Sequence, residues 1–545
     1  MRMQDGFFGV MLDMSRNAVM QPNKVIEFAT ILKSFGYNMI QLYTEDTYEI
    51  KDEPYFGYLR GRYTQEELKY IVSECEKLEM EVIPCIQTLG HLSQLLRWAD
   101  TADTHGPYAA IKNSSDILLV GEEKTYALIE KMVQTMRQCF TSNYIHIGMD
   151  EAHGVELGEY LARNGYRNGL EVLKEHLEHV LAIVEKYNFK PIMWSDMFYK
   201  LASGGGYYQP GNKETSELKE FVPQNVGLVY WDYYHYDQPF YEGMMTSHKK
   251  ITNNVWFAGA AWSWCGFAPG NGKTLDTMIP AMKAARRQKI DKIMVTLWGD
   301  NGKECSYFSL LPSLYTVKKV YDGEEDMEKI KADFQSLTGE SYDAMAYLDC
   351  PNYVGGNKSI SANVCKYVTY GDPFLNFFDS RWKEGVSAEY QAHKLELERL
   401  KVNSKYWYLY DYMESLCDFL SIKYDLGIRA RRAYNQQDQK GITEVAKDFF
   451  VAVEKLDALY KNLRNVWYKE NKPFGFEILD LRFGGMKQRL VSCGERLIDY
   501  VNGKLESIPE LDEPLIMDYA ANAETFSDFP CSNFWYYIVS PNYIG

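Results

Sequence analysis

The chain has 545 residues, of which 75 are acidic and 59 are basic, and its formal net charge is −16. The length suggests two or three domains, since a domain usually takes roughly 100–200 residues and an α/β barrel about 250. The acidic balance argues against nucleic acid or an anionic membrane as a partner, because both need a basic face. The aromatic content of 15% fits either a large core or a surface that binds flat, partly apolar ligands such as sugars.

Cysteine use and the N-terminal sequence indicate a reducing compartment. The ten cysteines are dispersed, with no CxxC pair and no Cys/His cluster at zinc spacing. Free buried thiols are therefore expected rather than a disulfide framework. The first fifteen residues lack the features of a signal peptide, and no run of about 18 apolar residues occurs. We expect a cytoplasmic protein without a membrane span.

Short apolar runs alternate with amphipathic stretches over residues 1–320. Eight of these runs are strand candidates, namely 7–12, 39–43, 82–86, 144–147, 191–194, 227–230, 255–260 and 293–297. Helices are predicted between them, including one over 24–35 that ends at Gly36 and one that a capping box opens at Thr64. Eight such units in about 300 residues predict an α/β fold of the (β/α)8 TIM barrel type. The alternative is a doubly wound open sheet, but no GxGxxG or phosphate loop supports its nucleotide-binding form.

From about residue 325 the sequence becomes helix-periodic. Long charged helices are predicted over 387–435 and 442–470, with another over 487–501. Residues 350–380 are expected to form an irregular connection, and 506–545 an irregular tail. The predicted domains are therefore a catalytic barrel over 1–320 and an all-α C-terminal domain over 321–545.

In a (β/α)8 barrel the active site forms at the C-terminal ends of the strands. Each predicted strand is followed there by a carboxylate, an aromatic ring or an imidazole. In chain order these are Asp13 and Arg16; Glu45 and Asp46; Gln87 and His91; Asp150 and Glu151; Trp194 and Asp196; Trp231, Asp232, Tyr233 and Tyr234; Trp262 and Trp264; and Trp298, Asp300 and Asn301. A single Trp is usually core and a single Asp often a cap. The recurrence at eight strand ends on one rim favours a binding site.

These residue types indicate carbohydrate chemistry. Aromatic rings stack on the C–H faces of sugars, and glycoside cleavage needs a carboxylic acid to protonate the leaving oxygen. There is no GxSxG nucleophile elbow. A metal site built from His146, Asp150, Glu151 and His153 is conceivable, but no dense ligand spacing supports it. No metal and no cofactor are therefore predicted.

The segment HIGMDE at 146–151 resembles the H-x-G-x-D-E signature of family 20 glycoside hydrolases, the β-N-acetylhexosaminidases. Four further segments are similar to motifs of that family in the same order: GVMLDMSRN to D-x-x-R, IPCIQTLGHL to P-x5-G-H, PIMWSDMF to Trp-x-acid, and TLWGDNG to Trp followed by an acid. The resemblance covers roughly residues 6–310. The segment KPFGFEILDLRFGGMKQRL resembles, more weakly, the helical domain that follows the barrel in some bacterial members.

The resemblance implies exo-acting removal of terminal β-linked N-acetylglucosamine or N-acetylgalactosamine by a substrate-assisted, retaining mechanism. In that mechanism the substrate's acetamido oxygen attacks the anomeric carbon and gives an oxazolinium intermediate. Glu151 would be the general acid and then the base, and Asp150 would orient the acetamido group. The implied substrate-binding residues are Arg16 at O3 and O4; Trp194, Trp298 and one or both of Trp262 and Trp264 around the acetamido methyl; Tyr233, or secondly Tyr230, at the acetamido oxygen; Asp300 or Asp232 at O4 or O6; and His91 beside the acid pair.

Some features depart from the family. Cys85 and Gln87 stand where members often have carboxylates, which puts any charge relay through His91 in doubt. The small α/β domain that often precedes the barrel is not expected, because the first strand begins at about residue 7. Two alternatives stay open: a non-catalytic sugar-binding barrel, and another retaining glycosidase that pairs Glu151 with a separate acid, namely Asp196, Asp232 or Asp300. Apolar helix faces in the C-terminal region suggest a homodimer or packing onto the barrel.

Overall fold

The computed structural model describes residues 6–100, 106–204, 206–209, 218–264, 266–357, 364–516, 539–540 and 542. Within them, eight parallel strands close into a barrel in chain order, and β1 pairs with β8. The strands are β1 (Phe7–Asp13), β2 (Met39–Thr44), β3 (Glu81–Ile86), β4 (Tyr144–His146), β5 (Lys190–Trp194), β6 (Gly227–Trp231), β7 (Val255–Ala260) and β8 (Lys292–Leu297). The predicted (β/α)8 barrel is confirmed, and the closure excludes the open-sheet alternative.

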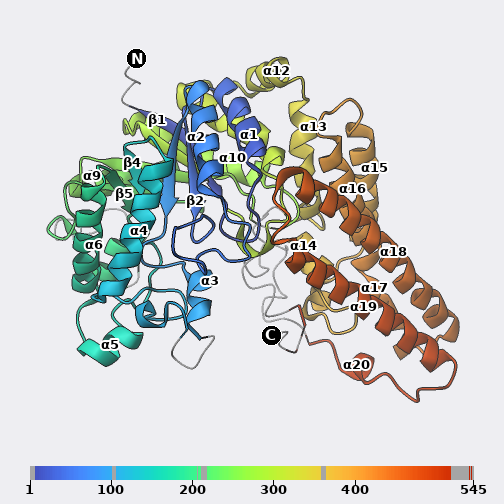
Figure 1. Ribbon diagram of the computed structural model, residues 1–545. Helices are drawn as coiled ribbons and strands as arrows, with labels where there is room; N and C mark the ends of the chain where they lie inside the picture. Colours follow the sequence, from blue (N-terminus) through green and yellow to red (C-terminus); the bar gives the residue numbers. More distant parts are fainter. Residues whose placement is uncertain are drawn as a thin grey trace. The chain divides into compact units, whose positions relative to one another are not determined.

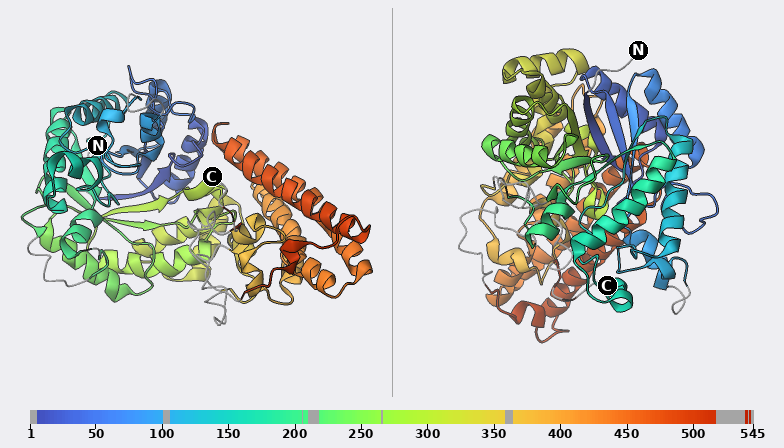
Figure 2. Two further views of the ribbon diagram at one scale, coloured as in Figure 1. Left: turned by 90° about the horizontal axis from the view of Figure 1, so that it is seen from below. Right: turned by 90° about the vertical axis from the view of Figure 1, so that its left-hand side faces the viewer.

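Helices follow the strands and surround the barrel, as Figures 1 and 2 show. They are α1 (Pro22–Ser34), α2 (Gln65–Lys77), α3 (Ser93–Leu96), α4 (Glu123–Cys139), α5 (Gly158–Asn164), α6 (Gly169–Lys186), α7 (Asp196–Ser203), α9 (Gln238–Ile251), α10 (Asn271–Arg287) and α11 (Leu311–Asp322). The predicted capping box is present, because the Thr64 side chain accepts from the Glu67 N–H and the Glu67 side chain accepts from the Thr64 N–H. The helix before β2 ends as predicted, with Gly36 at φ 94°.

The chain divides into two compact units. The first comprises Met1–Ala261, Thr274–Trp298 and Leu314–Asp326, and holds the barrel strands. The second comprises Trp262–Lys273, Gly299–Ser313 and Met327–Gly545. Its helices are α12 (Met327–Thr338), α13 (Tyr342–Ala346), α14 (Val364–Tyr370), α15 (Val386–Leu400), α16 (Trp407–Lys423), α17 (Leu426–Asn435), α18 (Gln439–Glu470), α19 (Phe476–Val501) and α20 (Pro509–Asp512).

The long helices α18 and α19 pack side by side in the second unit, through ring contacts such as Tyr460 with Phe483 at 5.9 Å. This unit also buries an ion cluster in which the Glu304 carboxylate lies 3.0 Å from Lys366 Nζ and 3.3 Å from Arg482 Nη1. A buried charge is tolerated only when it is paired in this way. The C-terminal region is therefore helical, as predicted, and has a packed core of its own.

Two sequence expectations for the helical region need correction. The helix predicted over 387–435 is three helices, α15 to α17, because the chain turns at 401–406 and again at Tyr424 and Asp425. The connection expected over 350–380 contains α14, all of whose residues are buried. Most of the tail predicted to be irregular lies outside the described residues.

Eight of the ten cysteines are free and buried, while Cys265 and Cys531 lie outside the described residues. Among the helices that the structure describes, none is both long and apolar enough to cross a membrane.

Candidate active site

The acid pair follows β4 at a sharp turn of the backbone. The strand ends at His146, and Gly148, Met149 and Glu151 then adopt positive φ angles of 70°, 70° and 50°. This left-handed geometry breaks the strand alternation, so that Asp150 and Glu151 can face one site. A Cβ at position 148 would lie 2.1 Å from Gln87 Oε1, and this explains why only glycine fits there. The strand therefore breaks directly after His146.

The His146 side chain packs inside the fold and stabilises the turn after β4. Its ring lies 4.5 Å from that of Trp194, and its Nδ1 accepts a hydrogen bond from the Gly148 N–H at 3.1 Å. Burial lowers the pKa of His146 to about 3, so the ring is neutral. In the described parts of the chain, no group of three or more His, Cys, Asp and Glu side chains is arranged to hold a metal ion.

Asp150 is enclosed by groups that favour its ionised form. Its Oδ2 lies 3.1 Å from His91 Nε2, and its Oδ1 accepts a hydrogen bond from Gln87 Nε2 at 2.8 Å. Burial alone would raise the pKa of Asp150, but the His91 charge and these contacts lower it to about 2. Conversely, burial would lower the pKa of His91, but the Asp150 carboxylate raises it to about 9. The two groups therefore form an ion pair at neutral pH.

Glu151 differs from its neighbour in exposure and in the direction of its pKa shift. Its side chain is 45% exposed, and its oxygens lie 3.6 Å from His91 Nε2 and 3.9 Å from Lys200 Nζ. Partial burial and then the Asp150 charge raise the pKa of Glu151. The site thus holds one ionised carboxylate beside an accessible carboxyl that retains its proton to higher pH.

Asp196 at the start of α7 and Lys200 in its last turn lie beside this acid. Asp196 Oδ2 accepts a hydrogen bond from the Glu151 N–H at 3.1 Å and lies 3.1 Å from Lys200 Nζ. Asp196 is buried and makes these two contacts, so it holds the backbone of Glu151 in place. The sequence predicted Asp196 as the acid after Trp194 and as a possible second carboxylate, but it gave no role to Lys200. The i, i+4 spacing of an acid and a lysine within one helix was the available signal.

Arg16 lies at the end of β1 between two acidic side chains. Its Nε is 3.5 Å from Asp13 Oδ2, and its Nη1 is 3.9 Å from Glu45 Oε1. The guanidinium also lies 5.8 Å from the centre of the Trp298 ring. Burial, opposed by Arg16, raises the pKa of Glu45 to about 7. Glu45 followed a predicted strand but received no role from the sequence.

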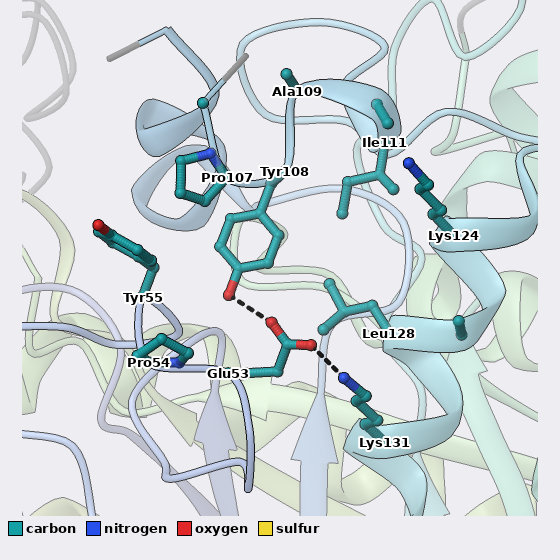
Figure 3. A pocket seen from close by; sticks show the side chains of 13 residues that line it. Glu53, Pro54, Tyr55, Pro107, Tyr108, Ala109, Ile111, Lys124, Leu128 and Lys131 are labelled. Carbon is teal, nitrogen blue, oxygen red and sulfur yellow. Dashed lines mark hydrogen bonds and ion pairs between the residues drawn. The ribbon is translucent and has the colours of Figure 1, made fainter. Parts of the chain in front are cut away.

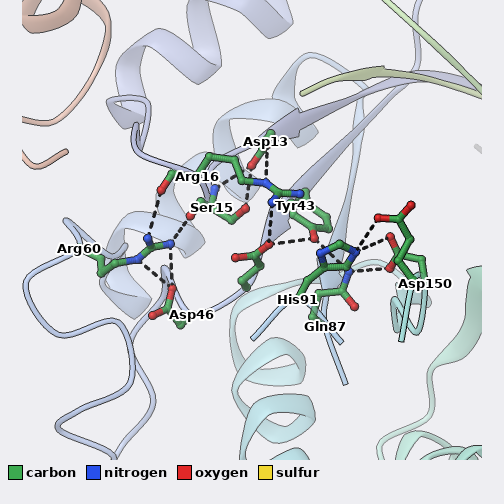
Figure 4. Close-up of polar contacts among 11 residues, drawn as sticks. Asp13, Ser15, Arg16, Tyr43, Asp46, Arg60, Gln87, His91 and Asp150 are labelled. Atoms are coloured by element: carbon green, nitrogen blue, oxygen red, sulfur yellow. Dashed lines mark hydrogen bonds and ion pairs between the residues drawn. The ribbon is translucent and has the colours of Figure 1, made fainter. Parts of the chain in front are cut away.

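A polar chain connects Arg16 with Asp150 across the site (Figure 4). Gln87 Nε2 donates to Asp150 Oδ1 and, at 3.0 Å, to the Tyr43 hydroxyl. The Tyr43 hydroxyl in turn donates to Glu45 Oε1 at 3.2 Å, beside Arg16. The Gln87 amide thus donates to both Asp150 and Tyr43 without adding a charge.

The predicted aromatic residues of the first unit lie close to one another. The Trp298 ring lies 4.9 Å from that of Tyr43 and 6.2 Å from that of Trp194. Tyr233 is also buried, and hydrogen bonds with the Trp298 and Thr296 side chains oppose the increase that burial causes in the pKa of Tyr233. The structure therefore brings Trp194, Trp298 and Tyr233 to one region beside Arg16.

Asp232 differs from its expected role as a direct sugar ligand. It is fully buried and accepts hydrogen bonds from the Tyr230 hydroxyl at 2.6 Å, from His235 Nδ1 at 2.8 Å and from the Tyr234 N–H at 3.0 Å. It therefore anchors the loop after β6 and presents no surface to a substrate in this arrangement.

The remaining predicted residues, Trp262, Trp264 and Asp300, belong to the second compact unit. The Trp262 and Trp264 rings stack with centroids 4.3 Å apart, and both residues are buried. Asp300 opens a short 3-10 turn over Asp300–Gly302. The roles of these residues at a sugar stay predictions.

A separate cavity of about 520 Å³ lies beside α4 and the 106–111 segment (Figure 3). Glu53 lines this cavity, accepts a hydrogen bond from the Tyr108 hydroxyl at 3.0 Å and pairs with Lys131 Nζ at 2.5 Å. No predicted site residue lines this cavity.

A (β/α)8 barrel whose strand ends carry a carboxylate pair, an arginine and tryptophans has the architecture of a glycoside hydrolase. The comparisons specify the family. Residues 6–238 match the family model described as "Glycosyl hydrolase family 20, catalytic domain", and residues 340–528 match "Glycoside Hydrolase 20C C-terminal domain". The chain belongs to glycoside hydrolase family 20, as the motifs predicted.

Individual relatives are distant. Hexosaminidase D of Bos taurus is 26% identical over 218 residues, which are 38% of this chain and 57% of that protein. Hexosaminidase D of Homo sapiens is 26% identical over 221 residues, covering 38% of this chain and 41% of that protein. A family 20 exo-β-N-acetylglucosaminidase of Vibrio harveyi, solved with N-acetylglucosamine, aligns at 17% identity and a TM-score of 0.45 over 61% of this chain and 58% of that one. The chain thus spans about half the length of the curated relatives it matches.

Proposed function

We propose that this protein is an exo-acting β-N-acetylhexosaminidase that releases terminal β-linked N-acetylglucosamine or N-acetylgalactosamine. The observation that carries the proposal is the pair of adjacent carboxyl groups with opposite pKa shifts. The pKa of Asp150 is lowered by His91 and Gln87, whereas burial and the Asp150 charge raise the pKa of Glu151. One group is thereby suited to stabilise positive charge and the other to donate a proton.

In the first step, the Glu151 carboxyl protonates the glycosidic oxygen, and the bond from this oxygen to the anomeric carbon breaks. The substrate's acetamido oxygen forms a new bond to that carbon and gives an oxazolinium ion. The Asp150 carboxylate accepts a hydrogen bond from the acetamido N–H and offsets the positive charge. In the second step, the Glu151 carboxylate takes a proton from water and the water oxygen bonds to the anomeric carbon. The bond from that carbon to the acetamido oxygen breaks, which restores the acetamido group and releases the sugar with retained configuration.

His91 contributes by its position between the two carboxyl groups. Its Nε2 lies 3.1 Å from Asp150 and 3.6 Å from Glu151. While Glu151 is protonated, the imidazolium pairs with Asp150. Once Glu151 has given up its proton, the same positive charge stabilises the new carboxylate. The missing family carboxylate at Gln87 therefore does not remove a role for His91.

The proposed recognition of the terminal sugar uses Arg16 at the O3 and O4 hydroxyls, with Trp194 and Trp298 around the acetamido methyl and Tyr233 at its oxygen. The proximity of these residues in the first unit supports this assignment. For Trp262, Trp264 and Asp300 a role at the sugar rests on the sequence motifs alone.

The test compares an aryl N-acetyl-β-glucosaminide, the matching galactosaminide and the plain aryl β-glucoside. Turnover of the acetamido substrates and none of the glucoside is expected, because only the former carry the internal nucleophile. Equal activity on the glucoside would favour a retaining enzyme with two separate carboxylates. Binding of N-acetylglucosamine without turnover would favour a non-catalytic barrel.

A cytoplasmic location and a homodimer are further proposals. The free buried cysteines support the first. Exposed apolar side chains in the helical region support the second, since Leu395, Trp407 and Leu481 are 57%, 49% and 73% exposed. Sedimentation velocity of the wild type and of Leu481→Glu tests the dimer, and a monomeric wild type would exclude it.

A further inference from the structure

We infer that Arg60 is a positioning residue that holds the backbone of Arg16 and thereby sets where the Arg16 guanidinium meets the terminal sugar. The structural part of this inference concerns only the two arginines. Its effect on catalysis rests on the proposed function of Arg16.

The Arg60 guanidinium contacts two backbone carbonyls and one carboxylate (Figure 4). Its Nη1 donates to the Arg16 carbonyl at 3.1 Å, and its Nη2 donates to the Ser15 carbonyl. Its Nε donates to Asp46 Oδ1 at 3.0 Å. The planar fork of donors thus connects the loop after β1 to the loop after β2.

The Arg16 side chain lies among acidic groups at the end of β1. It is 28% exposed, and its ion pairs with Asp13 and Glu45 measure 3.5 and 3.9 Å. The position of the guanidinium also depends on where the Arg16 backbone lies. Arg60 supplies contacts to that backbone from outside the β1 loop.

The Arg60–Asp46 pair is built into the loop. The Arg60 and Asp46 side chains are 11% and 1% exposed, so the ion pair is shielded from water. Gly57 has φ 64°, and a Cβ there would lie 2.0 Å from the Asp46 carbonyl oxygen. Only glycine allows the chain to return this closely to Asp46. This return places Arg60 next to Asp46, near the start of the loop after β2.

Arg62 offers a matched control. It lies two residues along the same loop, and its Nη1 donates to the carbonyls of Pro54 and Phe56. It therefore also uses a guanidinium to satisfy backbone oxygens, but those oxygens belong to its own loop. The change Arg→Lys at either position keeps the charge and removes the fork.

The experiment measures hydrogen–deuterium exchange of the peptide that covers residues 13–17, together with kcat and KM on the aryl N-acetyl-β-glucosaminide. Arg60→Lys is expected to speed exchange in this peptide and to lower kcat/KM about tenfold, the loss expected for one misplaced binding group. Arg62→Lys is expected to leave both unchanged.

A double-mutant cycle separates positioning from general damage. In an Arg16→Met background, Arg60→Lys should change kcat/KM by less than about twofold, since the group it positions is gone. If Arg60→Lys folds poorly, Asp46→Asn takes its place in the experiment. This variant keeps Arg60 but weakens its anchor, and it should change exchange and kcat/KM in the direction expected for Arg60→Lys. Unchanged exchange at 13–17, or a full tenfold loss in the Arg16→Met background, would overturn the inference. If the wild type turns over no acetamido substrate, the proposed function fails, but the exchange comparison still decides the backbone role.

Discussion

His91 Nε2 lies 3.1 Å from Asp150 Oδ2, and each group stabilises the charged form of the other. Burial would push both groups toward neutrality, yet the pKa of His91 is raised to about 9 and that of Asp150 is lowered to about 2 by their mutual attraction. The consequence is a fixed negative charge directly beside Glu151.

The ion pair should make the stability of the fold depend on pH. Because its folded pKa is depressed, Asp150 contributes stability above an unfolded pKa of about 3.9 and loses it as the pH falls toward 2. Because its folded pKa is raised, His91 contributes fully below about pH 6.5 and loses this as the pH rises through about 9. The difference in Tm between the wild type and His91→Gln should therefore be largest near pH 5–6 and shrink between about pH 6.5 and 9.

The titration of Glu45 needs a control in that measurement. Burial raises the pKa of Glu45 to about 7, so this group also titrates in the pH range where the Tm difference is expected to shrink. Repeating the comparison in a Glu45→Gln background removes its titration. A Tm difference that stays constant from pH 5 to 9 in both backgrounds would contradict the ion pair.

Removing the charge of Asp150 should change both the rate and its pH profile. Asp150→Asn is expected to lower kcat by about 10² or more, since the oxazolinium charge is no longer offset. Burial and the Asp150 charge together raise the pKa of Glu151, so this pKa should fall in the variant. The alkaline limb of kcat/KM therefore moves to lower pH. Glu151→Gln should lose kcat by a similar factor and lose that limb altogether. An unshifted limb in Asp150→Asn would show that another group is the acid.

Lys200→Met should shift the same limb in the opposite direction. The Lys200 ammonium lies 3.9 Å from Glu151 Oε1 and lowers the pKa of that carboxyl against the larger effect of burial. Its removal should raise the pKa of Glu151 further and move the alkaline limb to higher pH. Lys186→Met removes an exposed lysine that pairs with Glu130, and it should leave the profile unchanged. Equal profiles for the two variants would disprove an effect of Lys200 on the acid.

Gln87→Glu tests why an amide stands beside Asp150. The new carboxylate would lie close to Asp150, where Gln87 Nε2 is 2.8 Å from Oδ1, and two carboxylates at that distance share one proton. We expect kcat/KM to fall roughly tenfold or more at neutral pH and to recover partly in acid, where the shared proton removes the repulsion.

Gln87→Met separates the charge from the lost hydrogen bonds. It removes the donors to Asp150 and Tyr43 without adding a carboxylate. Its loss of kcat/KM should be the same at every pH within the working range. If both variants lose activity in parallel across pH, the amide acts only through its hydrogen bonds.

Much of the barrel could be predicted because its signals are local. All eight apolar runs overlap observed strands, and the capping box at Thr64 and the helix end at Gly36 are where the sequence placed them. The helical region was predicted less well. The helix-periodic stretch over 387–435 is three helices, since a change of direction between consecutive helices leaves little trace in their periodicity.

The α/β barrel, the acidic pair at 150–151 and the aromatic residues that follow the strands could be inferred from the amino-acid sequence, because hydrophobic periodicity and short motifs are properties of neighbouring residues. The contacts of Gln87 with Asp150 and Tyr43, the enclosure of Asp232 by its own loop, and the reach of Arg60 to the Ser15 and Arg16 carbonyls across about 45 residues of chain became evident only in the folded protein. These polar contacts depend on strand register and on the return of long loops to the barrel rim. No local pattern specifies them, because each group meets its partner only once the barrel has closed.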